Sequence, residues 1–100
     1  MNQKEIVDVL KLLVEIESVS SEKQHYKDVE KSAESVKALF KELGLTSKIS
    51  KSNNGMPAVL AQTEQDSNRK TVLLYAHHDV QPVGDLSLWE TEPFSPEIID

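Results

Sequence analysis

The chain has 100 residues, of which 38% are hydrophobic and 28% charged, and its formal net charge is −6. This composition is typical of one folded globular unit, and the excess of acidic residues disfavours nucleic acid as a partner. Cysteine is absent, which excludes disulfides and thiolate ligands, so any bound metal must be held by nitrogen and oxygen atoms.

The N-terminal stretch predicts an amphipathic helix. Asn2 and Glu5 have the spacing of a capping box. Apolar residues then recur at helical spacing over about four turns, at Ile6, Val9, Leu10, Leu13 and Ile16. Neither a secretory signal nor a run of membrane-spanning length is found in this stretch, so we expect a cytoplasmic protein without a membrane partner.

A second amphipathic helix is predicted after a serine-rich break. The break spans residues 18–21, where the serines are interpreted as helix caps rather than nucleophiles, and Ser21 with Gln24 predicts a second capping box. Gly44 is expected to end the helix. Its apolar face consists of Val29, Ala33, Val36, Phe40 and Leu43. Since each helix has a single apolar stripe, both are expected to cover a sheet.

Three strands are predicted after the helices. Residues 45–49 alternate between apolar and polar, Asn53, Asn54 and Gly55 are typical of a tight turn, and residues 57–63 predict the second strand. Five apolar or near-apolar residues, 72–76, predict a central strand that is covered on both faces. The expected fold class is therefore α/β, with two helices and then three strands of a mixed sheet, in a single unit over residues 1–100.

The chemistry is expected where the central strand ends, at His77, His78 and Asp79. Along a strand, His77 and Asp79 share a face and His78 points the other way. A metal-binding imidazole commonly donates its second N–H to a carboxylate, so His77 and Asp79 could form a metal ligand and its orienting partner. Spacing alone leaves another interpretation open, because one His and one Asp are fewer than the three protein ligands of a catalytic zinc. In that interpretation, His77 is a hydrogen-bonded histidine at a strand end and Asp79 caps a turn.

The residues after Pro82 predict an irregular loop. Its Trp89 and Phe94 are expected to pack against the domain rather than to contact substrate. The final apolar pair, Ile98 and Ile99, predicts a strand that is cut as it begins, so we expect a fragment. His25, among polar neighbours, is expected to be a solvated surface side chain.

Residues 73–83 read Leu-Leu-Tyr-Ala-His-His-Asp-Val-Gln-Pro-Val, and Leu-Trp and Pro-Phe follow. This run resembles the first metal-ligand motif of the M20 family of zinc-dependent metallopeptidases, especially its carnosine and cysteinylglycine dipeptidases. The preceding helical pair and the Ser-Val-Ser stretch are similar to the family pattern too, so the resemblance covers the whole chain. It implies the N-terminal part of a zinc-peptidase-like catalytic domain that hydrolyses peptide or related amide bonds of small substrates.

The resemblance also implies roles for particular residues. His77 would bind one of two Zn²⁺ ions, with Mn²⁺ or Co²⁺ as alternatives, and Asp79 would be the acidic residue of the catalytic site that orients it; no role is carried onto His78. The family's other ligands and general base lie downstream of this motif, as does a domain that commonly supports homodimerisation. We therefore expect residues 1–100 alone to be inactive. The alternative is a non-catalytic remnant or a module that docks to a partner.

Overall fold

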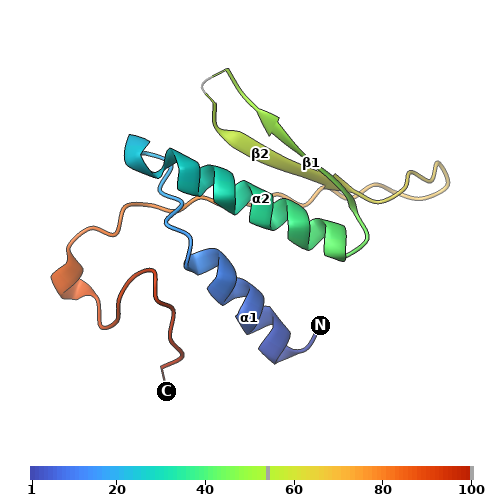
Figure 1. The fold of residues 1–100 in the computed structure, drawn as a ribbon. Helices are drawn as coiled ribbons and strands as arrows, with labels where there is room; N and C mark the ends of the chain where they lie inside the picture. Colours follow the sequence, from blue (N-terminus) through green and yellow to red (C-terminus); the bar gives the residue numbers. More distant parts are fainter. Residues whose placement is uncertain (54, 100) are drawn as a thin grey trace.

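The computed structural model describes residues 1–53 and 55–99, in which two helices are followed by a two-stranded antiparallel sheet (Figure 1). Helix α2 packs against both strands, and α1 contacts α2. The α/β class and the order of helices before strands are confirmed. The elements in chain order are α1 (Gln3–Val14), a 3₁₀ turn (Lys23–His25), α2 (Tyr26–Glu42), β1 (Thr46–Lys51), β2 (Pro57–Gln62) and a second 3₁₀ turn (Leu86–Leu88).

Helix α1 begins with the predicted capping box. The Asn2 side chain accepts a hydrogen bond from the Glu5 backbone N–H at 2.9 Å, and the Glu5 carboxylate accepts one from the Asn2 N–H at 2.7 Å. The helix ends at Val14, so Ile16 lies beyond it, where it is 6% exposed and part of the core.

The predicted capping box at the start of α2 is wrong. The helix begins at Tyr26 because residues 23–25 form the 3₁₀ turn, and its N-cap is His25, which makes no side-chain capping bond. The other end is as predicted. Gly44 has a φ of +85°, and its N–H donates to the Lys41 carbonyl, a left-handed termination that glycine adopts at little cost.

Strands β1 and β2 pair in register from Thr46 opposite Gln62 to Lys51 opposite Pro57. Both predicted strands are thus confirmed to within a residue or two at their ends. Asn54, at the centre of the predicted turn, lies outside the described residues, while Gly55 beside it has a φ of +83°.

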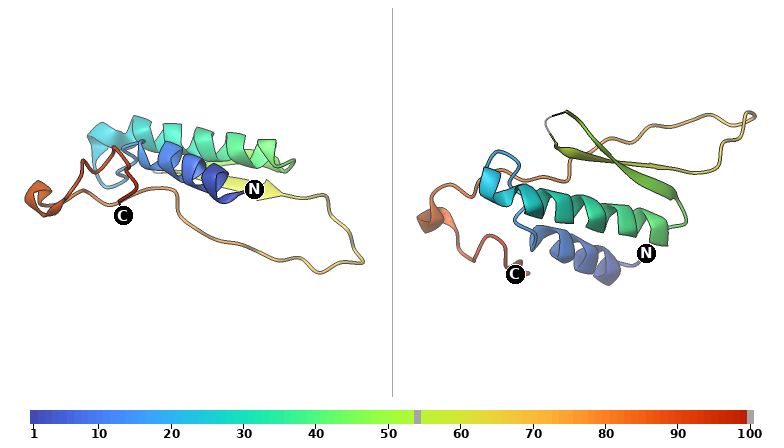
Figure 2. Two further views of the ribbon diagram at one scale, coloured as in Figure 1. Left: turned by 90° about the horizontal axis from the view of Figure 1, so that it is seen from below. Right: turned by 45° about the horizontal axis from the view of Figure 1, so that its top comes forward.

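The predicted central strand is not formed. Residues 72–76 have no strand partner in the part of the chain that the structure describes, and the side chains from Val72 to Tyr75 are 78–92% exposed. Figure 2 shows the segment leaving the hairpin and returning as an open loop. A strand needs a neighbour to accept and donate its backbone hydrogen bonds, and β2 pairs with β1 alone within the described residues.

The core lies where the chain leaves α1 and meets α2. Its apolar members are Ile16, Val19, Val29 and Ala33. The apolar stripe of α1 does not cover a sheet as predicted: Ile6 and Leu10 are more than half exposed, because α1 contacts α2 and not the hairpin. No helix within the described ranges has both the length and the apolar character needed to cross a membrane.

Candidate metal centre

The backbone that carries the histidines is attached to the core by the chain just after α1. Val80 donates its N–H to the Ser18 carbonyl at 3.0 Å, within a parallel bridge between Val19 and Val80. The hydroxyls of Ser18 and Ser32, both almost fully buried, donate to the His78 carbonyl at 3.3 and 3.2 Å. Residues 78–80 are therefore fixed to the core, although the apolar run before them is exposed.

His77 and Asp79 lie together. The Nδ1 atom of His77 is 2.8 Å from the Asp79 carbonyl oxygen and 3.1 Å from its carboxylate Oδ1. Both oxygens accept hydrogen bonds, so we infer that Nδ1 carries the proton and donates it. The lone pair is then on Nε2, on a side chain that is 77% exposed. This is the tautomer in which an imidazole binds a metal through Nε2.

The second carboxylate oxygen of Asp79 has a different donor. Ser20 Oγ donates to Asp79 Oδ2 at 2.5 Å. This hydrogen bond is the main reason that the pKa of Asp79 is lower than its ordinary value; hydrogen bonding to His77 lowers it further, and partial burial opposes both. Asp79 is thus an ionised acceptor at neutral pH, held from both sides.

The pairing of His77 with Asp79 does not arise from strand geometry. The expected strand would have put them on one face, but the segment forms none, and the contact is made by the Nδ1 hydrogen bonds instead. Binding of a metal by His77 and its orientation by Asp79 stay predictions. Sequence reasoning missed Ser20, because nothing local relates two residues that are 59 positions apart.

His78 has partners of its own in the fold. Its Nε2 is 3.2 Å from the Pro57 carbonyl oxygen at the start of β2, and its Nδ1 is 3.1 Å from Ser32 Oγ on α2. A ring protonated on Nε2 donates to the Pro57 carbonyl, and its Nδ1 shares the single proton of the Ser32 hydroxyl with the His78 carbonyl oxygen. His78 therefore joins α2 to β2, and neither ring nitrogen is left for a metal.

Replacing His78 with Ala is expected to lower the free energy of unfolding by about 1–3 kcal/mol, because the part-buried Pro57 carbonyl loses its donor and the Ser32 hydroxyl keeps only the backbone carbonyl of residue 78 as a partner. Urea denaturation measures this effect. Tyr75→Ala is the matched control, since Tyr75 is 92% exposed and its loss should change stability little. Equal denaturation midpoints for the two variants would show that the His78 ring does not stabilise the contact between α2 and β2.

His25 is surrounded by carboxylates, contrary to the solvated side chain predicted. Its Nδ1 is 3.0 Å from Asp28 Oδ2 and 3.7 Å from Glu17 Oε2, and its Nε2 is 3.6 Å from Glu22 Oε2. The Glu17, His25 and Asp28 ligand atoms lie within 4.8 Å of one another, a spacing that could hold a cation. The ion pairs of a protonated imidazole already account for the arrangement. The hydrogen bond to Asp28 is the main cause that raises the pKa of His25 above 6.5, with the charges of Glu17 and Glu22 also raising it.

This raised pKa predicts how stability depends on pH. The protonated His25 stabilises the folded chain fully below its unfolded pKa, and that contribution is lost as pH rises through the higher folded pKa. We therefore expect the unfolding midpoint to fall with increasing pH above about 6.5, and to fall less steeply in His25→Gln. Thermal melts over this range measure both slopes, and indistinguishable slopes would contradict the assignment.

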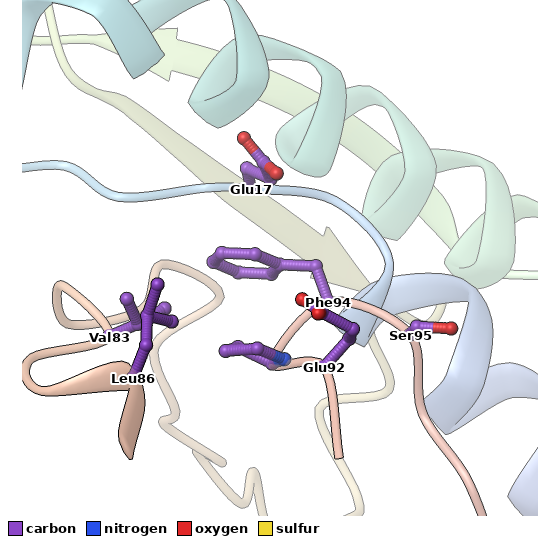
Figure 3. Close-up of a pocket in the computed structure, with 7 residues that line it drawn as sticks. Glu17, Val83, Leu86, Glu92, Phe94 and Ser95 are labelled. Carbon is purple, nitrogen blue, oxygen red and sulfur yellow. The ribbon is translucent and has the colours of Figure 1, made fainter. Parts of the chain in front are cut away.

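A hollow of about 440 Å³ lies between the end of α1 and the C-terminal loop. It is lined by Glu17, Val83, Leu86, Glu92, Pro93, Phe94 and Ser95. Figure 3 shows the Phe94 ring extending into it from the loop. Phe94 is half-buried, in line with the predicted packing, whereas Trp89 stays 46% exposed and donates its indole N–H to the Val83 carbonyl. Neither His77 nor Asp79 lines this hollow, so we do not take it as a substrate pocket.

Comparison with known proteins relates part of the chain to characterised enzymes. It is 47% identical over 38 residues to the Cys-Gly metallodipeptidase DUG1 of Saccharomyces cerevisiae, and 49% identical over 39 residues to that of Schizosaccharomyces pombe. It is also 40% identical over 47 residues to succinyl-diaminopimelate desuccinylase 2 of Ruegeria sp.. No family model and no solved structure matches the chain.

These matches are short relative to the proteins concerned. They cover 38–47% of this chain but 8% of the length of the two yeast dipeptidases and 12% of the desuccinylase. The chain thus spans a small part of the curated relatives that it matches. What the matches support is a metallopeptidase-like relationship of the M20 type.

Proposed function

We propose that His77 is one ligand of the metal centre of a hydrolase that cleaves peptide or related amide bonds in dipeptides or similar small substrates. The observation that carries the proposal is the contact of His77 Nδ1 with the carbonyl and carboxylate oxygens of Asp79, an arrangement in which the neutral ring carries its lone pair on the exposed Nε2. The matched relatives named as metallodipeptidases support the same chemistry.

The residues present fit one ligand position of a zinc ion. Imidazole nitrogen suits Zn²⁺, while Mn²⁺ and Co²⁺ are alternatives. One imidazole is fewer than the three protein ligands that a catalytic zinc takes, so we propose that the others, and those of a second ion, come from outside residues 1–100. By the complete enzyme we mean the polypeptide that contains this segment together with those ligands.

The chain's own residues would hold the ligand rather than perform the bond cleavage. When bound, a zinc ion supplies Lewis-acid polarisation of a carbonyl and lowers the pKa of a bound water. Asp79 holds the His77 ring in one tautomer through Nδ1 and raises its basicity by its negative charge. Its lowered pKa keeps that charge in place at neutral pH. Asp79 is in these terms a positioning residue.

A second candidate function is a non-catalytic module that docks to a partner. The exposed apolar run from Val72 to Tyr75 favours it, because a contiguous exposed apolar patch is typical of a surface that another protein covers. The same apolar run would be expected if residues 72–75 formed a strand in a larger catalytic sheet, so the run alone does not separate the enzyme from the docking module. Metal-dependent turnover does separate these two candidate functions.

Removing the metal from the complete enzyme should therefore abolish hydrolysis of a dipeptide such as cysteinylglycine. Losing several kcal/mol of transition-state stabilisation corresponds to a fall of more than about 100-fold in kcat. Dialysis against a chelator and re-addition of Zn²⁺ tests this, with Ca²⁺, which prefers oxygen ligands, as the control that should not restore turnover. Full turnover in the exhaustively stripped protein would refute the proposed function.

A further inference from the structure

We propose that Ser20 is a positioning residue of this metal centre: its hydroxyl holds the Asp79 carboxylate, which in turn holds His77 with Nε2 free for a metal. The inference rests on the proposed function and extends it to a residue in the segment between α1 and α2. It concerns how the ligand is held, not the bond that is cleaved.

The three side chains form a series of hydrogen bonds. Ser20 Oγ donates to Asp79 Oδ2 at 2.5 Å, and His77 Nδ1 donates to Asp79 Oδ1 at 3.1 Å. Each carboxylate oxygen thus has its own donor. Rotation of the Asp79 carboxylate about its Cβ–Cγ bond would break both contacts. The hydrogen bond from Ser20 therefore restricts the orientation of the carboxylate plane relative to the His77 imidazole.

Ser20 is itself well placed to act as an anchor. It directly follows Ser18 and Val19, which are 0% and 3% exposed, and the bridge between Val19 and Val80 joins the residues next to Ser20 and Asp79. His77, by contrast, is 77% exposed and follows a run that packs on nothing in the described structure. The orientation of its ring is therefore determined from the Asp79 side, where Ser20 connects the carboxylate to the core.

A purely structural role for Ser20 is the alternative. The contact between residues 18–20 and 78–80 has two other hydrogen bonds, from Val80 N–H to the Ser18 carbonyl and from the Ser18 hydroxyl to the His78 carbonyl, and the Ser32 hydroxyl of α2 donates to that same carbonyl. Since these stay when Ser20 is replaced, the junction should still form in a Ser20→Ala variant. An effect on the metal ligand can then be separated from an effect on folding.

The test is the zinc affinity of the complete enzyme, measured by competition with a chromophoric chelator. We expect Ser20→Ala to weaken zinc binding about 10-fold, the lower end of the loss for an outer partner of a metal ligand. Ser20→Thr keeps the hydroxyl and should stay within about twofold of the unmodified enzyme. Ser21→Ala is the matched control, since Ser21 is its exposed neighbour, and should have no effect.

A double-mutant cycle shows whether Ser20 acts through Asp79. If it does, Ser20→Ala should change zinc affinity by less than about twofold when Asp79 is already Ala. An unchanged affinity in Ser20→Ala, or an equal loss in both backgrounds, would overturn the proposal and leave Ser20 a structural residue. The His77→Ala variant separates failure of the Ser20 proposal from failure of the proposed function. If His77→Ala keeps full zinc affinity, the proposed function itself fails; if it loses zinc affinity, only the role of Ser20 is overturned.

Discussion

Replacing His77 with Ala in the complete enzyme is expected to lower kcat/KM for dipeptide hydrolysis by more than about 100-fold and to reduce bound zinc. The physical reason is that the variant removes the exposed Nε2 lone pair, which we propose as a ligand. Losing only an outer partner of a ligand typically costs 10- to 100-fold, and losing the ligand itself should cost more. Steady-state kinetics and the metal content of the purified protein measure the two effects.

His78→Ala is the matched control for this variant. The two histidines are adjacent, but both ring nitrogens of His78 are engaged by Ser32 and Pro57. The control should therefore lose stability while it keeps its zinc content. If His77→Ala kept both its zinc and its turnover, His77 would not be a ligand.

Replacing Asp79 with Ala is expected to lower kcat/KM about 10- to 100-fold while the fold stays intact. Without the carboxylate, His77 Nδ1 keeps only the backbone carbonyl as acceptor and the ring loses the negative charge that raises its basicity. Kinetics at saturating zinc, alongside thermal melts, separate this effect from unfolding.

Asp85→Ala provides the comparison for Asp79→Ala. Asp85 is another carboxylate with a lowered pKa, caused chiefly by a hydrogen bond from the Ser87 hydroxyl, but it lies in the C-terminal loop. Its removal should leave kcat/KM within about twofold, as for a change distant from the site. Unchanged kinetics in Asp79→Ala would remove Asp79 from the mechanism.

The parts of the fold that local chemistry determines were predictable from the sequence. The Asn2 and Glu5 capping box, the termination of α2 just before Gly44 and the β1–β2 hairpin all depend on residues within a few positions of one another. The proximity of His77 and Asp79 belongs to the same class, since two residues at i and i+2 can meet through a side-chain hydrogen bond even where no strand forms.

Apart from the local capping box at Ser21 and Gln24, the main wrong or missing predictions involve contacts between distant segments. Residues 72–76 have the composition of a buried strand, but a strand also needs a pairing partner, which a local pattern does not contain. Ser20 meets Asp79 where residues 18–20 contact residues 78–80, and no spacing rule indicates it. Part of the His25 cluster was predictable: Glu22 and Asp28 lie three residues on either side, a spacing that favours side-chain contact near a helix end.

The protonation state of the His77 ring tests the account most directly, because each proposed role depends on Nδ1 carrying the proton and Nε2 the lone pair. Long-range ¹H–¹⁵N correlation NMR of the ¹⁵N-histidine-labelled enzyme reports both nitrogens, first without metal and then with stoichiometric Zn²⁺. We expect a protonated Nδ1 in the metal-free protein and a change in the Nε2 resonance of His77 when zinc is added. A proton on Nε2, or an Nε2 resonance that zinc leaves unchanged, would contradict the account.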